Sequence, residues 1–276
     1  MMSSRPSPVR KAVGVSLSAF AACFVVGLFV CSPLLAAGGY ACTVIALAAN
    51  TVLSFAVPGL IMRYYAVGGA MALAGGGGSV ALFGLSAVLS VVCQSLVEWA
   101  AHLDWFIDTT FNLSGPMSQA SKELLASVCD FSDAWHWAAT LVTIALLPAL
   151  CEELFFRAGL LPLLRRLTGG WKSAIVISAI IFSAVHMDPA GFLSRTILGI
   201  LLGVIFVETR SLWVSATFHF LNNAMCVISI AVAESPLGAL TAEPEAPTFF
   251  ETIFSLALTV YILVVLSKLA RGKMER

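Results

Sequence analysis

The chain has 276 residues, a net charge of zero, 59% hydrophobic residues and a mean hydropathy of +0.96. This composition indicates a polytopic membrane protein, and neither a separate soluble domain nor a charge imbalance that would favour a nucleic-acid partner is visible. The seven cysteines form no C-x-x-C pair and mostly lie in apolar runs, so we interpret them as small buried hydrophobic residues and not as disulfides or metal ligands.

Two apolar runs of membrane-spanning length open the chain. A short basic lead precedes the first run, residues 13–35, whose length favours a retained spanning helix. A cleaved signal peptide is the alternative, because small residues follow at 36–38. The second run, residues 43–62, predicts the second span.

A third span is expected at residues 80–103, after a glycine-rich loop at 64–79. Residues 104–134 then form a polar, partly interfacial segment. Within it, apolar residues recur at helical spacing, which predicts a short amphipathic helix in the membrane interface: Leu124, Leu125, Val128 and Phe131.

Five further apolar runs predict the remaining spans. The first of the five begins near Trp135, and the other four cover residues 171–187, 192–207, 212–232 and 249–269. Pro148 cannot donate a hydrogen bond to the carbonyl of Ile144, so the fourth span should bend or loosen there. We therefore expect an all-α fold of about eight transmembrane helices, with residues 1–276 forming one integral membrane domain.

Loop charges predict the orientation in the cell membrane. If the N-terminus lies in the cytoplasm, the loops on that side carry most of the lysine and arginine, and the opposite loops carry nearly all the acidic residues. The positive-inside rule then places both termini in the cytoplasm.

The fourth span contains a charged stretch, C-E-E-L-F-F-R, at residues 151–157. A charged side chain near the centre of a spanning helix costs roughly 2.5–3.5 kcal/mol, so three together require partners and usually mark a functional site. Glu153 and Arg157 are four residues apart and face each other, whereas Glu152 points about 100° around the helix. We expect a Glu153–Arg157 ion pair and a free Glu152 that could serve as general base. The alternative is a purely structural ion pair with a spare glutamate at a water-filled seam.

Three further polar residues lie in later spans: His186, His219 and Asn223. His219 and Asn223 are four residues apart and share a helix face. At about 1.5 Å per residue from the cytoplasmic edges, Glu152, His186 and His219 lie roughly 20, 21 and 14 Å deep. A single buried histidine is more often a hydrogen-bonded core residue than a catalyst. Ionisable groups of three helices at similar depth, however, indicate one shared site.

These residues form three motifs that resemble those of the CPBP family, the CAAX-protease and bacteriocin-processing (Abi) intramembrane proteases. The motif E-E-x-x-x-R is met by Glu152, Glu153 and Arg157, F-x-x-x-H by Phe182 and His186, and H-x-x-x-N by His219 and Asn223. They follow in order within a motif-bearing core at residues 146–224, just over a quarter of the chain. Ala158 departs from the glycine that is usual after the arginine.

The resemblance implies an eight-helix intramembrane endopeptidase similar to type II CAAX prenyl endopeptidases. By this likeness Glu152 activates water, His186, His219 and Asn223 position the water or stabilise the oxyanion, and Glu153, Arg157 and Phe182 support them. The family is commonly labelled a metalloprotease, although a metal-free glutamate mechanism has also been argued for it. Glu153, His186 and His219 could supply three ligands to a divalent metal such as zinc.

The implied partner is a peptide or protein substrate with a membrane-proximal or lipidated end. Two other classes stay open. A catalytically silent immunity or binding scaffold would have the same fold, and a transporter could use the same buried charges as a proton relay. No paired halves with broken helices, which would favour a transporter, are visible in the sequence.

Overall fold

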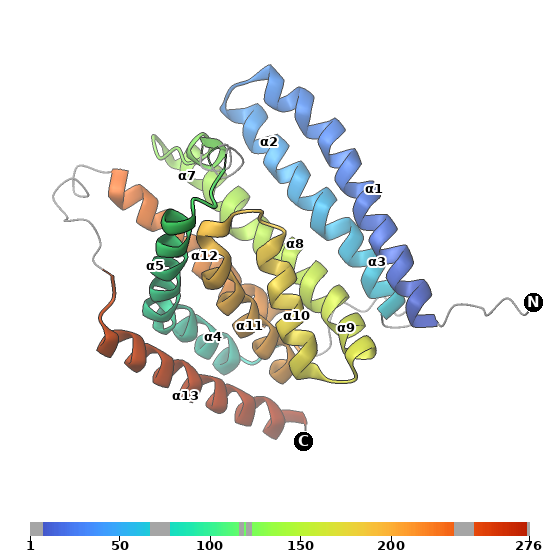
Figure 1. Cartoon of the computed structure of the whole chain (residues 1–276), viewed down its shortest axis with the longest axis vertical. Coiled ribbons are helices and arrows are strands. Elements are labelled where there is room, and N and C mark those ends of the chain that lie inside the picture. The colour runs from blue at the N-terminus through green and yellow to red at the C-terminus, as the bar shows by residue number, and fades with distance from the viewer. Residues whose placement is uncertain (1–7, 67–77, 116–118, 120–122, 235–245, 275–276) are drawn as a thin grey trace, which may run out of the picture.

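The computed structural model describes residues 8–66, 78–115, 119, 123–234 and 246–274, and all regular elements in this part of the chain are helices (Figure 1). The predicted all-α fold is therefore confirmed. Most of the expected glycine-rich loop at 64–79, and most of the residues between the last two expected spans, 233–248, lie outside the described residues.

The first half forms a helical hairpin followed by a bent helix pair. Its elements are α1 (Pro8–Ala37), α2 (Tyr40–Thr51), η1 (Val52–Ala56), α3 (Val57–Ala66), α4 (Val80–Val92) and α5 (Gln94–Phe111). The second half begins with one long helix made of five consecutive segments: α7 (Ala134–Thr140), η2 (Leu141–Leu146), α8 (Leu147–Glu153), η3 (Leu154–Leu160) and α9 (Leu161–Thr168). It continues with α10 (Trp171–Ala184), η4 (Pro189–Gly191), α11 (Phe192–Thr209), α12 (Leu212–Glu234) and α13 (Phe249–Met274).

Six helices in the described chain are long and apolar enough to cross a membrane, or seven if the pair α4 and α5, bent by 41°, counts as one broken span. The expected fifth span corresponds to α10, which has 14 residues and a length of about 21 Å, less than the roughly 30 Å of a bilayer core. The structure thus supports a polytopic membrane fold without confirming the number eight.

Three segments of the described chain are π-helical, and each is followed by a proline two residues later. Pro58 follows η1, Pro148 follows η2 and Pro162 follows η3. A proline cannot donate to the carbonyl four residues before it and its ring collides with that carbonyl, so a wider turn ahead of the proline relieves the collision. The loosening expected at Pro148 therefore takes the form of a π-helical segment.

The long helix packs closely against α3 at two glycines. A Cβ on Gly59 would lie 2.9 Å from the Cα of Phe155, and a Cβ on Gly159 would lie 2.9 Å from the Cβ of Met62. Small residues let helix backbones approach in this way inside a membrane, where dispersion contacts drive helix association.

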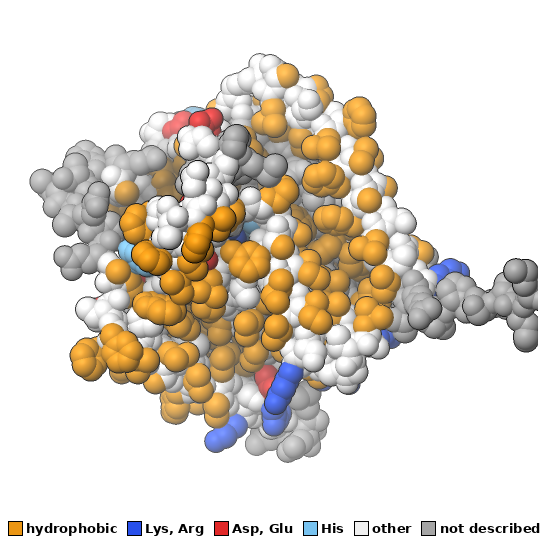
Figure 2. All heavy atoms as spheres, viewed as in Figure 1, with side chains coloured by type: hydrophobic (Ala, Val, Ile, Leu, Met, Phe, Trp, Pro, Cys, Tyr) orange, Lys and Arg blue, Asp and Glu red, His pale blue; other side chains and the backbone are white. Residues whose placement is uncertain are grey.

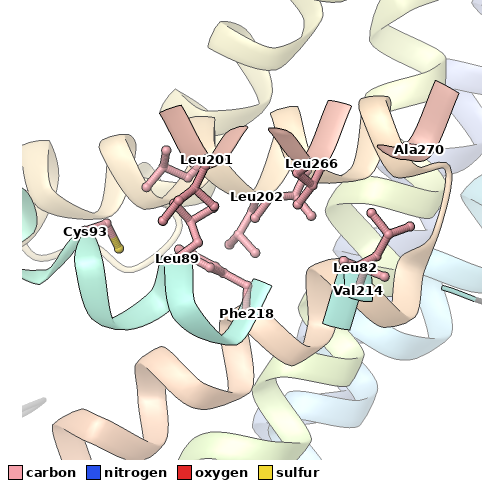
Figure 3. Packing of buried hydrophobic residues seen from close by; sticks show 11 residues of the cluster. Leu82, Leu89, Cys93, Leu201, Leu202, Val214, Phe218, Leu266 and Ala270 are labelled. Atoms are coloured by element: carbon pink, nitrogen blue, oxygen red, sulfur yellow. The ribbon is translucent and has the colours of Figure 1, made fainter. Parts of the chain in front are cut away.

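On the other side of the long helix, α4, α11, α12 and α13 share a core. Its fully buried residues include Leu89, Leu202, Phe218 and Leu266, one from each helix (Figure 3). Apolar side chains are spread over the whole visible face, and lysine and arginine lie near its lower and right edges (Figure 2). Such an exterior is typical of a protein surrounded by lipid.

Several helix ends that carry basic residues meet at one end of the molecule. The Arg165 guanidinium lies 4.3 Å from the centroid of the Trp171 ring, and that of Arg210 lies 5.1 Å from the same centroid. Arg271 of α13 pairs with Glu208 at 3.0 Å. The ends of α9, α11 and α13 and the start of α10 thus come together.

At the opposite end, α5 departs from the expected third span. It continues past residue 103 to Phe111, and the buried carboxylate of Asp104 accepts hydrogen bonds from the backbone N–H groups of Leu193 at 2.8 Å and Ser194 at 2.9 Å. These N–H groups belong to the first turn of α11 and have no helical partners. Because the carboxylate caps α11, an acidic residue is stable within the helix.

Part of the expected amphipathic helix in residues 104–134 lies outside the described residues. Residues 123–126 are helical, Val128 is buried, and the Phe131 ring lies 4.6 Å from that of Trp137. This polar segment therefore packs against the start of α7.

Candidate active site

The ion pair expected between Glu153 and Arg157 is present, and it is completely buried. Glu153 is the last residue of α8, Arg157 lies in η3, and the Arg157 Nε is 3.3 Å from the Glu153 Oε2. The two residues are 0% and 1% exposed. The Arg157 Nη2 also donates to the Gly199 carbonyl at 3.4 Å, and the guanidinium carbon lies 5.0 Å from the Phe182 ring centroid. The arginine is thus held by a charge, a carbonyl and an aromatic face.

Two residues of α12 also bind the Glu153 carboxylate. The Ser215 hydroxyl donates to Oε2 at 2.5 Å, and the His219 Nδ1 donates to Oε1 at 3.1 Å. Both oxygens of Glu153 are therefore occupied by protein groups. This arrangement ties the long helix to α12 and fixes the orientation of the His219 ring.

Glu152 has a different environment from its neighbour. It is 7% exposed, its closest charged partner is the His219 Nε2 at 3.8 Å, and no hydrogen bond to its carboxylate is found among the described residues. That separation is too long for a direct hydrogen bond. One water could bind both groups, because two bonds of about 2.8 Å span up to about 5.6 Å.

His186 lies two residues beyond the end of α10. Its Nδ1 is 2.8 Å from the Phe182 carbonyl, which can only accept, so Nδ1 carries the hydrogen. The Phe182 ring lies 5.2 Å from the His186 ring and 5.8 Å from the His219 ring. The phenylalanine of the second motif thus contacts both histidine rings, and its carbonyl orients His186.

Glu152, His186, His219 and Asn223, the four residues predicted to be catalytic, all line one cavity of about 240 Å³. The other lining residues are mostly apolar and come from η2, α8, α10, α11 and α12: Ile144, Pro148, Phe182, Arg195, Leu198, Leu202, Phe218, Asn222 and Cys226. A small, mainly apolar cavity with a few convergent polar groups is typical of a ligand or active site.

The predicted metal ligands Glu153, His186 and His219 do not form a coordination site in this arrangement. Glu153 lies behind His219, with both oxygens engaged by Arg157, Ser215 and His219, and it does not line the cavity. No group of three or more histidine, cysteine or acidic residues within the described chain is placed to hold a metal ion. The donor set that the sequence offered therefore does not fit a zinc centre.

Sequence reasoning missed three polar residues at the site. Ser215 binds Glu153, Asn222 lines the cavity, and Arg195 lines the cavity while pairing with Asp188 at 3.1 Å. Ser215 is four residues before His219, so helical spacing could have placed it on the same face. Asn222 is adjacent to the motif asparagine, and no sequence pattern marks it. Its place at the site is seen only in the structure, where it lines the cavity and binds Gln94.

Comparisons with known proteins agree with the motif residues. Among curated proteins and among solved structures, none matches this chain. The family model described as Type II CAAX prenyl endopeptidase Rce1-like matches residues 134–225, about a third of the chain, from the start of α7 into α12. This segment contains all three motifs. The match confirms the resemblance, and through this segment the chain is similar to the CPBP and type II CAAX prenyl endopeptidase family.

Proposed function

We propose that this protein is an intramembrane endopeptidase in which Glu152 activates the water that hydrolyses a peptide bond. One observation carries the proposal: Glu152, His186, His219 and Asn223 line a single small cavity, while Glu153 is engaged elsewhere. The similarity to a family of CAAX-type membrane proteases supports the same reaction.

In this mechanism the Glu152 carboxylate removes a proton from water as the water oxygen attacks the carbonyl carbon of the scissile bond. The resulting oxyanion needs hydrogen-bond donors, and the Asn223 side-chain amide on the cavity wall can supply them. Collapse of the tetrahedral intermediate breaks the C–N bond, and protonated Glu152 returns the proton to the leaving amine. The residue thus serves first as base and then as acid.

The hydrogen bonds of the two histidines define their roles. The Nδ1 of His219 donates to Glu153 and the Nδ1 of His186 donates to the Phe182 carbonyl. In a neutral imidazole this leaves Nε2 as an acceptor. Glu152 takes one hydrogen of the attacking water, so one of the two histidines can accept the other, and a positively charged imidazolium would instead donate to the oxyanion. Glu153 favours the required tautomer of His219 in the way an orienting carboxylate does in catalytic triads.

We place both termini in the cytoplasm. The basic ends of α9, α10, α11 and α13 meet at one end of the molecule, and the positive-inside rule assigns that end to the cytoplasm. A membrane-impermeant thiol reagent should label Thr168→Cys, at the basic end, only from inside and Thr110→Cys only from outside. The reverse pattern would overturn this topology.

We expect the substrate to be a peptide or protein with a membrane-proximal or lipidated end. The decisive experiment is cleavage of a panel of prenylated and unmodified peptides by purified full-length protein. Glu152→Gln should abolish cleavage, and Glu208→Gln, a glutamate substitution in the Arg271 ion pair outside the cavity, should not. A wild-type protein that binds peptides without cleaving any of them would instead indicate the silent scaffold.

The metal question is tested in the same assay. Because Glu153, His186 and His219 do not form a ligand set, we expect cleavage to survive a chelator. Activity that disappears with chelator and returns with zinc would show that the site binds a metal through a different set of ligands.

A further inference from the structure

Two asparagines of α12 line the cavity, and the proposed reaction uses only Asn223. We propose that the neighbouring Asn222 is a second substrate-binding residue, whose side-chain amide donates a hydrogen bond to a peptide carbonyl of the substrate beside the scissile bond, and that Gln94 is its positioning residue. This inference rests on the proposed function and adds a substrate-binding role to a residue outside the three motifs.

The orientation of the Asn222 amide follows from a chain of hydrogen bonds. The Gln94 Nε2 donates to the Ser90 carbonyl at 2.6 Å and to the Asn222 Oδ1 at 3.1 Å. A backbone carbonyl can only accept, so the Gln94 atom that faces Ser90 must be the nitrogen. Its second hydrogen then requires an acceptor on Asn222. Ser90 therefore orients Gln94, and Gln94 orients Asn222.

The break between α4 and α5 allows the Ser90–Gln94–Asn222 hydrogen bonds to form. Ser90 lies in the last turn of α4, where carbonyls lack helical partners, and the chain bends by 41° before Gln94 opens α5. The Ser90 carbonyl accepts from the Cys93 thiol at 3.6 Å and from the Gln94 side chain, which also reaches across to α12. The bend thus has a consequence at the cavity wall.

With its oxygen held by Gln94, Asn222 can direct only its amide N–H groups into the cavity. The residue is 5% exposed, it lines the cavity, and no hydrogen bond from its Nδ2 is found among the described residues. A donor in a mainly apolar cavity needs an acceptor, and the neutral acceptor that a peptide offers is a backbone carbonyl.

The geometry of α12 indicates that the substrate carbonyl bound by Asn222 is not the carbonyl of the scissile bond. His219 and Asn223 form one row on α12, and Phe218 and Asn222 form the adjacent row. The Glu152–His219 contact marks the reacting centre on the first row. Asn222 therefore meets the substrate next to the scissile bond, so the hydrogen bond forms in the ground state and in the transition state alike.

Such uniform binding lowers KM and leaves kcat unchanged. Asn222→Leu removes the donor. Gln94→Glu replaces the donor that binds the Asn222 Oδ1 by an acceptor, so the Asn222 NH₂ group should turn toward residue 94 and away from the cavity. Each variant should raise KM for a cleaved panel peptide about 3- to 10-fold, the range expected for one neutral hydrogen bond, with kcat within about twofold of wild type. The double variant should be no worse than Asn222→Leu, because both substitutions remove the same interaction.

Ser86→Ala is the matched control for a merely structural effect. The Ser86 hydroxyl donates to the Val214 carbonyl at 2.8 Å, so it joins α4 to α12 as Gln94 joins α5 to α12, but Ser86 does not line the cavity. Ser86→Ala should leave KM unchanged. If Ser86→Ala raised KM as much as Gln94→Glu does, the proposal would be overturned. It would also be overturned if Asn222→Leu or Gln94→Glu lowered kcat without raising KM.

Substrate analogues identify the carbonyl itself. In each panel peptide one non-scissile amide is replaced by a thioamide, whose sulfur is a poorer acceptor than the carbonyl oxygen. The replacement should weaken binding when it falls on the carbonyl that Asn222 contacts, and Asn222→Leu should abolish this difference in Kd. Measuring Kd in a Glu152→Gln background keeps this test independent of turnover. Asn222-dependent binding without wild-type cleavage would sink the proposed function and uphold this inference. Thioamide effects that are the same with and without Asn222, or the absence of any peptide binding, would refute the inference.

Discussion

Replacing Glu153 by glutamine should destabilise the protein far more than the same change at Glu152. Glutamine offers one oxygen and one NH₂ group where glutamate offers two acceptors. At Glu153 both oxygens face donors, from His219 on one side and from Ser215 and Arg157 on the other. If the amide oxygen faces Ser215 and Arg157, the NH₂ group faces the His219 Nδ1 and forces the opposite tautomer of that ring. In the other orientation the NH₂ group opposes the Arg157 guanidinium.

The magnitude follows from the burial of the pair. Removing one partner of a buried ion pair leaves an uncompensated charge and costs about 3–5 kcal/mol, and Arg157 is only 1% exposed. At about 2 °C per kcal/mol for a chain of this size, the midpoint of thermal unfolding should fall by at least about 6 °C. Glu152 has no hydrogen-bond partner among the described residues, so Glu152→Gln should leave the midpoint nearly unchanged.

Cysteine labelling during heating provides the assay. Cys93 and Cys151 are buried and free, so a thiol-reactive dye should report their exposure as the detergent-solubilised protein unfolds. Glu208→Gln is the control, because the partly exposed Glu208–Arg271 pair should contribute less than about 1 kcal/mol. Equal unfolding midpoints for Glu153→Gln and wild type would refute the assignment of Glu153 as the structural carboxylate.

Three other substitutions test the site and the helix packing. His219→Gln should lower kcat by about 10²–10³-fold in the peptide-panel assay, the range for loss of one preorganised hydrogen-bonding group at the reacting centre; a loss below tenfold would contradict the role given to this histidine. Gly59→Ala should lower the unfolding midpoint, because its Cβ would lie 2.9 Å from the Phe155 backbone, at a cost of about 1–3 kcal/mol. Gly84→Ala, with nothing within 4 Å, should be neutral or stabilising in the same dye assay, and equal effects at the two glycines would refute the packing argument. Asp104→Ala should cost about 1–2 kcal/mol by uncapping α11, and an unchanged midpoint would show that the cap is dispensable.

Local spacing correctly predicted two structural features of the candidate site. The Glu153–Arg157 pair follows from a separation of four residues, and the His219–Asn223 face follows from the same rule. Hydropathy predicted the helices, because a membrane-spanning backbone must satisfy its own hydrogen bonds within each segment. These properties depend on residues close together in the sequence.

Contacts between distant segments could not be predicted in the same way. The expected third span ended before Asp104, because an acidic residue in an apolar helix is costly unless a partner is present, and its partners lie about 90 residues away in α11. The three proposed metal ligands were chosen by residue type and depth. Depth alone could not show that Glu153 faces Ser215 and the back of His219, so that His186 and His219 line the cavity and Glu153 does not.

Two adjacent carboxylates in a membrane must solve the same physical problem, and in this chain each has a different solution. Glu153 is neutralised by Arg157 and bound by α12, so it contributes to the packing of the long helix and to the orientation of His219. Among the described residues Glu152 has no arginine or lysine partner, only the His219 Nε2 at 3.8 Å, and a carboxylate inside a membrane protein is stabilised when water reaches it. The cavity beside Glu152 can hold water, and a water bound there is the molecule that a general base would activate. The same separation of roles explains why glutamine at the two positions should have opposite consequences, with activity lost at one and stability lost at the other.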